Sequence, residues 1–259
     1  MASKYIDFDD PSNRDTYVGR TADPAWVDLY SRLVRPGGRR IADVGCGGGI
    51  YTKAIAYLKP AWVLGIDSSE LSLESARKYC AGAPNVRFLR TDAEALAVPD
   101  NDFDNVVERA LIHHFASLDK NFHEVFRVLR PDGTLWLQDR TLDDVLQPPS
   151  EEHIRGFYLS FDERLRNTEI ERRRRGEDIV RALRSAGFRD VSSDKLRELR
   201  KIFYSPEELR EEILTRRGRS ILHGLDDDQL ERLADFVLRQ ITTWPVRERD
   251  TWTVWVARK

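Results

Sequence analysis

The sequence predicts an α/β fold with a doubly wound, mostly parallel sheet and helices on both of its faces. Two observations support this prediction. Short apolar runs alternate with stretches of helical periodicity between residues 40 and 138. The first apolar run, at 40–44, leads into a glycine-rich turn at 45–49, and a helical pattern follows. A strand that passes through such a turn into a helix presents backbone N–H groups to a ligand, so this stretch also indicates a binding site.

A helix is expected ahead of the sheet, over about residues 24–34. Asp23 suits the N-cap, Pro24 suits the first helical position, and Pro36-Gly37-Gly38 ends the helix. One face of this helix is apolar and consists of Trp26, Leu29, Tyr30 and Leu33.

The sheet region follows with an alternation of strands and helices. The strands are expected at 40–44, 62–67, 86–90, 103–108 and 134–138. The helices between them are expected at about 49–58, from Ser68 or Ser69 to 80, and at 118–128. In a sheet of this kind ligands bind at the carboxyl ends of the strands. The candidate residues of the sheet region lie near those ends.

The pattern changes after the fifth strand. The expected elements are helices at 151–169, 177–186 and 226–241, a helix capped by Ser205, and strands at 189–199 and 251–256. The first of these helices has an apolar stripe made of Ile154, Phe157, Tyr158, Phe161 and Leu165. The stripe either packs into a core or lines a ligand pocket with its aromatic members, and the sequence leaves both interpretations open.

Composition restricts the functional classes. The 259 residues carry a net charge of −2, which gives no global attraction to nucleic acid or to anionic lipid. No apolar run approaches the roughly 18 residues of a membrane-spanning helix, and the first ten residues do not resemble a signal peptide. The two cysteines suggest neither a disulfide framework nor a metal cluster. A cytoplasmic location, no bound metal and no membrane partner are therefore expected.

The glycine turn has the spacing Asp43-x-Gly45-x-Gly47-x-Gly49. A dinucleotide fingerprint would need a glycine at position 50, which is isoleucine. The spacing resembles motif I of the class I S-adenosylmethionine (SAM)-dependent methyltransferases. SAM contains no phosphate, so such a turn need only let an amino-acid tail and a ribose lie against its backbone. Asp43 can tie the turn down through backbone N–H groups or face the positive end of the ligand.

Two further stretches strengthen the resemblance: Leu111-Ile112-His113-His114 and Arg127-Val128-Leu129-Arg130-Pro131-Asp132-Gly133. The resemblance is to the small-molecule methyltransferases. It implies a Rossmann-like, seven-stranded sheet whose last strand is reversed, with helical cap insertions. The chain would form a single methyltransferase domain, 1–259. Its parts would be an N-terminal lid and helix at 1–38, a SAM-binding core at 39–140, and cap insertions at 141–176 and 203–245.

The other candidate residues follow the next strands. Asp67 comes 22 residues after Gly45 and can accept hydrogen bonds from ribose hydroxyls. In the resembling family an acid at Asp92 accepts from the adenine amino group, although Asp92 can also cap the short turn after it. The cofactor-binding residues expected from the resemblance are Tyr17, Arg20, Asp43, Gly45, Cys46, Gly47, Gly49, Asp67, Ser68, Asp92, Ala93 and Arg109.

Tyr17 and Arg20 would belong to a lid that closes over SAM, with a solvated arm as the alternative. The transfer itself needs mainly alignment and exclusion of water, because the sulfonium methyl is already a strong electrophile. A hydroxyl acceptor would also need a base, for which His113 and His114 are the candidates. The alternative is that both histidines pack beside the cofactor without acting on protons.

The function expected from the resemblance is methyl transfer from SAM to a small organic acceptor, with S-adenosylhomocysteine (SAH) as product. The alternatives are a tRNA or protein methyltransferase and a non-catalytic SAM-binding protein. The Arg172–Arg175 run could suggest nucleic-acid binding, but acids flank it, so a solvated and salt-bridged helix face is expected instead. The motifs are specific for SAM and unspecific for the acceptor.

Overall fold

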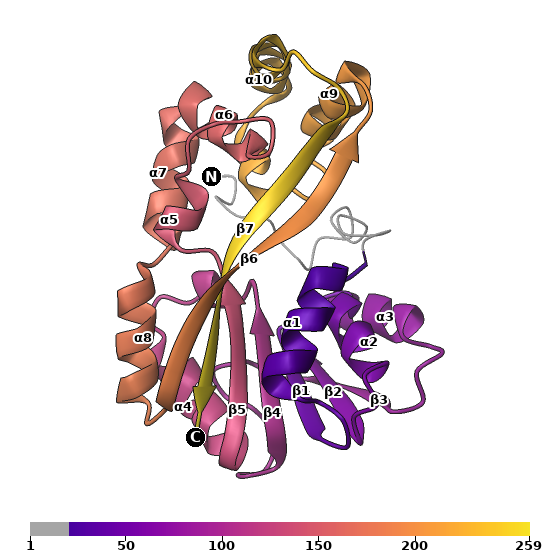
Figure 1. Ribbon diagram of the computed structural model, residues 1–259, viewed down its shortest axis with the longest axis vertical. Helices are drawn as coiled ribbons and strands as arrows, with labels where there is room; N and C mark the ends of the chain where they lie inside the picture. The colour runs from indigo at the N-terminus through magenta and orange to yellow at the C-terminus, as the bar shows by residue number, and fades with distance from the viewer. Residues whose placement is uncertain (1–20) are drawn as a thin grey trace.

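The computed structural model describes residues 21–259 and contains one seven-stranded sheet with the order β3-β2-β1-β4-β5-β7-β6 (Figure 1). The parallel strands are β1 (Arg40–Val44), β2 (Trp62–Asp67), β3 (Val86–Arg90), β4 (Phe103–Arg109) and β5 (Leu129–Asp139). The last strand, β7 (Val246–Arg258), pairs antiparallel with β5. The predicted doubly wound fold with a reversed last strand is therefore confirmed.

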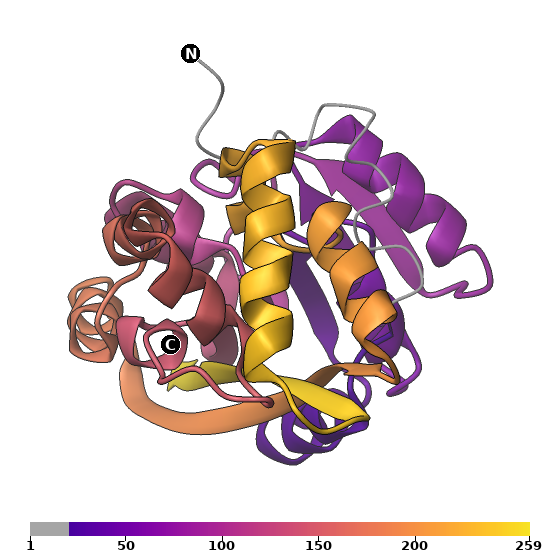
Figure 2. The same ribbon diagram turned by 90° about the horizontal axis from the view of Figure 1, so that it is seen from above.

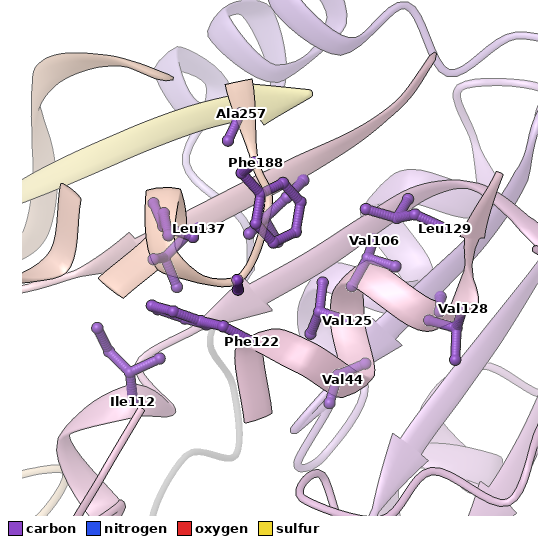
Figure 3. Close-up of a cluster of buried hydrophobic side chains, with 14 of the residues drawn as sticks. Val44, Val106, Ile112, Phe122, Val125, Val128, Leu129, Leu137, Phe188 and Ala257 are labelled. Carbon is purple, nitrogen blue, oxygen red and sulfur yellow. The ribbon is translucent and has the colours of Figure 1, made fainter. Parts of the chain in front are cut away.

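Helices cover both faces of the sheet because the strand side chains alternate between two apolar layers. On one face, α1 (Pro24–Val34) and α2 (Ile50–Ala56) pack through Trp26, Tyr30 and Ile55. On the other face lie α4 (Asp119–Val128) and α8 (Gly176–Ser185). Figure 3 shows part of this second layer, where Phe122 and Val125 of α4 meet Val106 and Leu137 of the sheet. The remaining helix of this region is α3 (Glu70–Tyr79).

Most helix boundaries predicted from capping residues are confirmed. The Asp23 carboxylate accepts a hydrogen bond from the backbone N–H of Ala25 at 2.7 Å, and Ser69 caps α3. Gly187, with a φ of +104°, follows the end of α8. One prediction for α1 was wrong, because Leu33 is 40% exposed and the neighbouring Val34 is buried in its place.

The strand β6 (Arg189–Phe203) and its partner β7 are longer than predicted. They pair antiparallel from Arg189↔Arg258 to Phe203↔Val246, whereas β5 pairs with β7 only as far as Thr253. The other halves of the two strands form a two-stranded ribbon that extends beyond the sheet (Figure 1). The sequence conceals this extension because its strands contain charged residues where a buried strand would be apolar.

We use the name cap for the helices that surround this ribbon, together with the ribbon itself. They are α6 (Ile154–Phe161), α7 (Glu163–Arg172), α9 (Pro206–Leu214), the 3₁₀ helix η3 (Ser220–Gly224) and α10 (Asp227–Gln240). A short helix, α5 (Leu142–Val145), connects the sheet to the cap. The helix predicted at 151–169 is thus two helices, divided at Asp162, whose side chain caps the second.

The cap has an apolar core of its own. Ile154, Tyr158 and Leu165 pack there with Leu209 and Leu233. Seen from the cap end, α9 and α10 lie in front of the sheet (Figure 2). Within residues 21–259, no helix combines the length and the apolar character that crossing a membrane would require.

Candidate functional site

A cleft of about 1180 Å³ lies between the carboxyl ends of the parallel strands and the cap. The glycine turn, the end of β2, the turn after β3 and the segment after β4 form its sheet side. Residues of α6, α7, β6 and β7 form its cap side. A pocket for one drug-sized ligand usually measures about 300–1,000 Å³. The cleft therefore has room for two small ligands side by side.

The glycine turn is fixed to the neighbouring strand and open toward the cleft. The N–H groups of Gly45 and Cys46 donate to the carbonyl of Ile66 at 2.8 and 2.9 Å. Gly45 has a φ of +72°, and a Cβ there would lie 2.8 Å from Cδ1 of Leu111. Gly47 has a φ of +51°, but a Cβ there would meet no atom of the described residues within 4 Å. Gly47 therefore leaves space that a ligand can occupy.

Asp43 is buried beneath the turn, where its Oδ2 accepts a hydrogen bond from the hydroxyl of Thr52 at 2.5 Å. Burial raises the pKa of Asp43 to about 6. The contact with Thr52 ties β1 to α2. Of the two roles predicted for Asp43, the one that involves backbone N–H groups of the turn falls to another residue, Asp67.

Asp67, the last residue of β2, connects the glycine turn to the segment between β2 and α3. Its Oδ2 accepts from the N–H of Gly47 at 2.8 Å and its Oδ1 from the N–H of Ser69 at 3.0 Å. A carboxylate can accept about four hydrogen bonds, so Asp67 can also accept from ligand hydroxyls at the cleft. Ser68 lines the cleft beside it. Cys46 lines the cleft as well, and burial raises the pKa of its thiol.

The turn after β3 places Asp92 and Ala93 at the same cleft. Asp92 is exposed, and its Oδ1 accepts from the N–H of Glu94 at 2.8 Å. The predicted capping role of Asp92 is therefore confirmed, and its side chain remains accessible at the cleft. The predicted contacts of Asp92 and Ala93 with adenine stay predictions.

Arg109, at the end of β4, lies between two aromatic rings. Its guanidinium carbon is 4.1 Å from the ring centroid of Tyr51 and 4.2 Å from that of Trp252. The same group pairs with Glu198 of β6 at 2.6 Å. Glu198 also accepts from Gln138, which in turn accepts from the indole N–H of Trp26. This network connects α1 with β4, β5 and β6. Arg109 lines the cleft, and its predicted contact with the cofactor stays a prediction.

His113 and His114 lie after β4 in the 3₁₀ helix η2 (Ile112–His114). Nδ1 of His113 is 2.9 Å from Oδ2 of Asp139, the last residue of β5. Burial and the nearby Arg173 lower the pKa of His113 to about 3, so its ring is neutral near pH 7. Asp139 thus accepts from Nδ1–H, and Nε2 keeps its lone pair. Asp139 was not predicted from the sequence, although it lies at a strand end, where ligand-binding residues are expected.

The Arg172–Arg175 run forms salt bridges as predicted, but Arg172 and Arg173 do not lie on a solvated helix face. The side chains of Arg172 and Arg173 are only 5% and 3% exposed, and both pair with buried Glu169. Arg174 donates to two backbone carbonyls of the segment after η2. The prediction of a solvated face was wrong because α7 ends at Arg172 and the backbone of Arg173 is extended, which turns the chain toward the sheet.

The apolar stripe at 154–165 packs inside the cap, and none of its members lines the cleft. The core interpretation of this stripe is therefore correct. Tyr17 and Arg20, the predicted lid residues, lie outside the described residues. The cap side of the cleft is instead rich in charged residues that were not predicted from the sequence, among them Arg140, Arg155, Arg172, Arg173, Arg200, Lys201, Glu212 and Asp250.

Comparison with known proteins identifies the sheet region. Residues 42–137 match a family described as a methyltransferase domain. An uncharacterized methyltransferase of Bacillus subtilis, YcgJ, is 36% identical over 136 residues, which is 47% of this chain and 52% of that protein. A ubiquinone biosynthesis O-methyltransferase of Sinorhizobium fredii is 36% identical over 108 residues, or 40% of this chain and 43% of the relative. The chain thus spans about half the length of these relatives.

A solved structure extends the likeness to the whole fold. The crystal structure of the same YcgJ protein superposes with a TM-score of 0.62 at 20% sequence identity. The superposition covers 90% of this chain and 97% of that one. At this level of identity the likeness shows a shared fold, which includes the seven-stranded sheet with the reversed last strand.

Proposed function

We propose, from the premise that residues 42–137 are a class I SAM-dependent methyltransferase domain, that this chain transfers a methyl group from SAM to a small organic acceptor. The main support is that the matched residues and the cap enclose one cleft with room for two ligands. The glycine turn and the strand ends after β2 and β3 form the half of the cleft that suits the cofactor.

The residues in that half fit SAM in three respects. Gly47 leaves open space where any other residue would place a Cβ. Asp67 ends β2 at the cleft, where its oxygens can accept from vicinal hydroxyls such as those of a ribose. Asp43 and Asp67 together give this end of the cleft a negative potential, which suits a ligand with an amino group and a sulfonium.

SAM, when bound, supplies an electrophilic methyl group on its sulfonium. The chain then has to align the acceptor with that methyl and to exclude water. The cap serves the second purpose, since it covers the carboxyl edge of the sheet (Figure 2). His113 can accept a proton at Nε2, but its pKa of about 3 makes it a weak base. A positioning role for His113 is therefore favoured over proton abstraction.

Calorimetry tests the cofactor part of this proposal. SAM and SAH should bind at micromolar concentration, and NAD should show no comparable affinity. The reverse order would contradict the proposal. Tight SAH binding without SAM consumption, across a broad panel of acceptors, would instead favour a binding protein without turnover. Salt-dependent retention on RNA would favour the tRNA alternative. A cytoplasmic location remains a prediction.

A further inference from the structure

We infer that the acceptor is an anionic small molecule whose carboxylate or phosphate group binds to an arginine cluster at the cap end of the cleft. The cluster consists of Arg140, Arg155, Arg172 and Arg173. This inference rests on the proposed function, since it names the substrate class for the second ligand in the same cleft.

The cluster is built around a glutamate that the cleft does not reach. Glu169 is 0% exposed and pairs with three arginines: Arg155 at 2.8 Å, Arg173 at 3.0 Å, and Arg172. All three arginines line the cleft, whereas Glu169 does not. Glu169 therefore binds the three guanidinium groups on the side that faces away from the cleft.

Each guanidinium group has more donors than the protein uses. An arginine side chain carries five N–H donors. Arg155 and Arg172 each direct one hydrogen bond to Glu169. The Nε of Arg172 has no hydrogen-bond partner among residues 21–259 but is itself buried, so the donors that a ligand can reach are those of the terminal nitrogens. A ligand with several oxygen atoms could accept from the remaining donors, and carboxylate and phosphate match the fork geometry of arginine.

Among the described residues, the cluster carries more positive than negative charges. Arg140 adds a fourth guanidinium and pairs with Asp250 at 2.6 Å. Within residues 21–259, these four cations thus form ion pairs with three carboxylates, those of Asp139, Glu169 and Asp250. His113 is neutral near pH 7 and adds no charge. The chain as a whole has a net charge of −2, so this positive excess is local.

Burial makes the excess costly. Burial and the neighbouring guanidinium charges lower the pKa of Arg140 to about 10, in spite of its contact with Asp250. Burial together with Arg173 and Arg155 also lowers the pKa of Arg172. A buried charge is unfavourable unless it is paired. An anionic ligand would supply the missing partner.

The position of the cluster suits an acceptor. Arg173 pairs with Asp139, which also holds His113, so the cluster lies beside the segment after β4. An acceptor anchored there would extend along the cleft toward the cofactor half. The side chains of Arg140, Arg155, Arg172 and Arg173 are 11% exposed or less. Arginines buried to this degree can meet a small molecule inside a cleft, but they cannot meet the surface of a polymer.

Calorimetry on the protein saturated with SAH tests the inference. The anionic probes are citrate, succinate and glycerol 3-phosphate, and the uncharged counterparts are triethyl citrate, succinamide and glycerol. At least one anionic probe should bind more tightly than its counterpart, and the comparison of carboxylates with the phosphate ester identifies the group preferred. Equal or absent binding of the charged and uncharged probes would overturn the inference.

Variants assign the binding to the cluster. Arg155→Met and Arg172→Met should each weaken the anionic probe by about tenfold or more, the loss expected for a hydrogen bond to a charged group. Arg172→Lys should restore part of the affinity. Arg164→Met, on the exposed face of α7, is the matched control and should have no effect. Either methionine variant alone suffices if the other does not fold.

SAH affinity separates this inference from the proposed function. SAH should bind the variants as it binds the unmodified chain. If Arg155→Met and Arg172→Met weaken SAH instead of the anionic probe, the arginines bind the carboxylate of the cofactor and the inference fails. If the unmodified chain does not bind SAH, the proposed function fails first.

Discussion

Replacing Glu108 by glutamine should remove most of one pH-dependent component of stability. Glu108 is the sixth residue of β4 and is 0% exposed. Its Oε1 accepts from the side-chain amide of Asn121 at 2.8 Å, and its Oε2 has no hydrogen-bond partner among the described residues. Burial raises the pKa of Glu108 to about 8 in the folded chain. Near pH 7 this carboxyl group is therefore protonated.

The direction of the pH effect on stability follows from the pKa of Glu108 in the folded and in the unfolded chain. In the unfolded chain Glu108 has an ordinary pKa of 4.5, so it ionises there first. Between about pH 4.5 and 8, folding requires the uptake of a proton, and a rise in pH therefore disfavours the folded chain. The loss is about 1.4 kcal/mol per pH unit, or roughly 3 kcal/mol between about pH 5.5 and 7.5. Glutamine cannot ionise, so Glu108→Gln should escape this loss.

Urea unfolding over that pH range measures the effect. The free energy of unfolding of Glu108→Gln, relative to the unmodified chain, should rise steadily with pH. Glu124→Gln is the control, because hydrogen bonds from Arg127 lower the pKa of Glu124 below its ordinary value of 4.5. Its stability deficit should stay constant over this pH range, since Glu124 is ionised there in both the folded and the unfolded chain, and should shrink only below about pH 4.5. A pH-independent difference for Glu108→Gln would show that the folded chain ionises Glu108 normally and would refute the reasoning.

Three further predictions concern the cleft and the cap. Asp67→Ala should weaken SAH by about 1.5–3 kcal/mol, the usual loss for hydrogen bonds to a charged group; unchanged affinity in calorimetry would exclude Asp67 from the cofactor site. Gly47→Val should abolish SAH binding because its side chain fills the open space beside the turn, while Gly48→Ala should have a smaller effect; similar losses in the two variants would contradict a ligand at Gly47. Tyr158→Ala should cost about 3–5 kcal/mol of stability, as for a buried aromatic, with normal SAH binding per folded molecule. An unchanged melting temperature with impaired turnover would instead indicate that Tyr158 contacts the acceptor in the cleft.

The cofactor half of the cleft could be predicted from the sequence because its parts are local. Each buried strand appears as a short apolar run, and each candidate residue follows such a run directly. Asp67 and Asp92 were found in this way, since parallel strands bring their carboxyl ends to one edge. What this rule could not assign was the role of each acid. Asp43 and Asp67 both precede turns, and only the structure shows that Asp67 holds the N–H of Gly47.

The cap could be predicted only in part. The apolar stripe of α6 and α7 was visible, but the same periodicity fits a core and a pocket wall equally well. The lengths of β6 and β7 were underestimated because, in the outer half of the ribbon, these two strands pair only with each other. Glu198 and Glu248 on these strands are buried and paired with arginines. Hydrophobic periodicity has no signal for a strand of this kind.

The residues of the acceptor half could not be predicted from the family resemblance, because they lie outside the matched region. The matched methyltransferase domain ends at residue 137, and none of the four arginines of the cluster lies within it. In the sequence, Glu169 and the arginines three and four positions later have the spacing of an exposed helical ion pair. In the structure these ion pairs are buried, because α7 ends at Arg172 and the chain then returns to the sheet, where Arg173 pairs with Asp139. Likeness to the relatives therefore bears on the cofactor, while the acceptor has to be inferred from residues that this chain folds together itself.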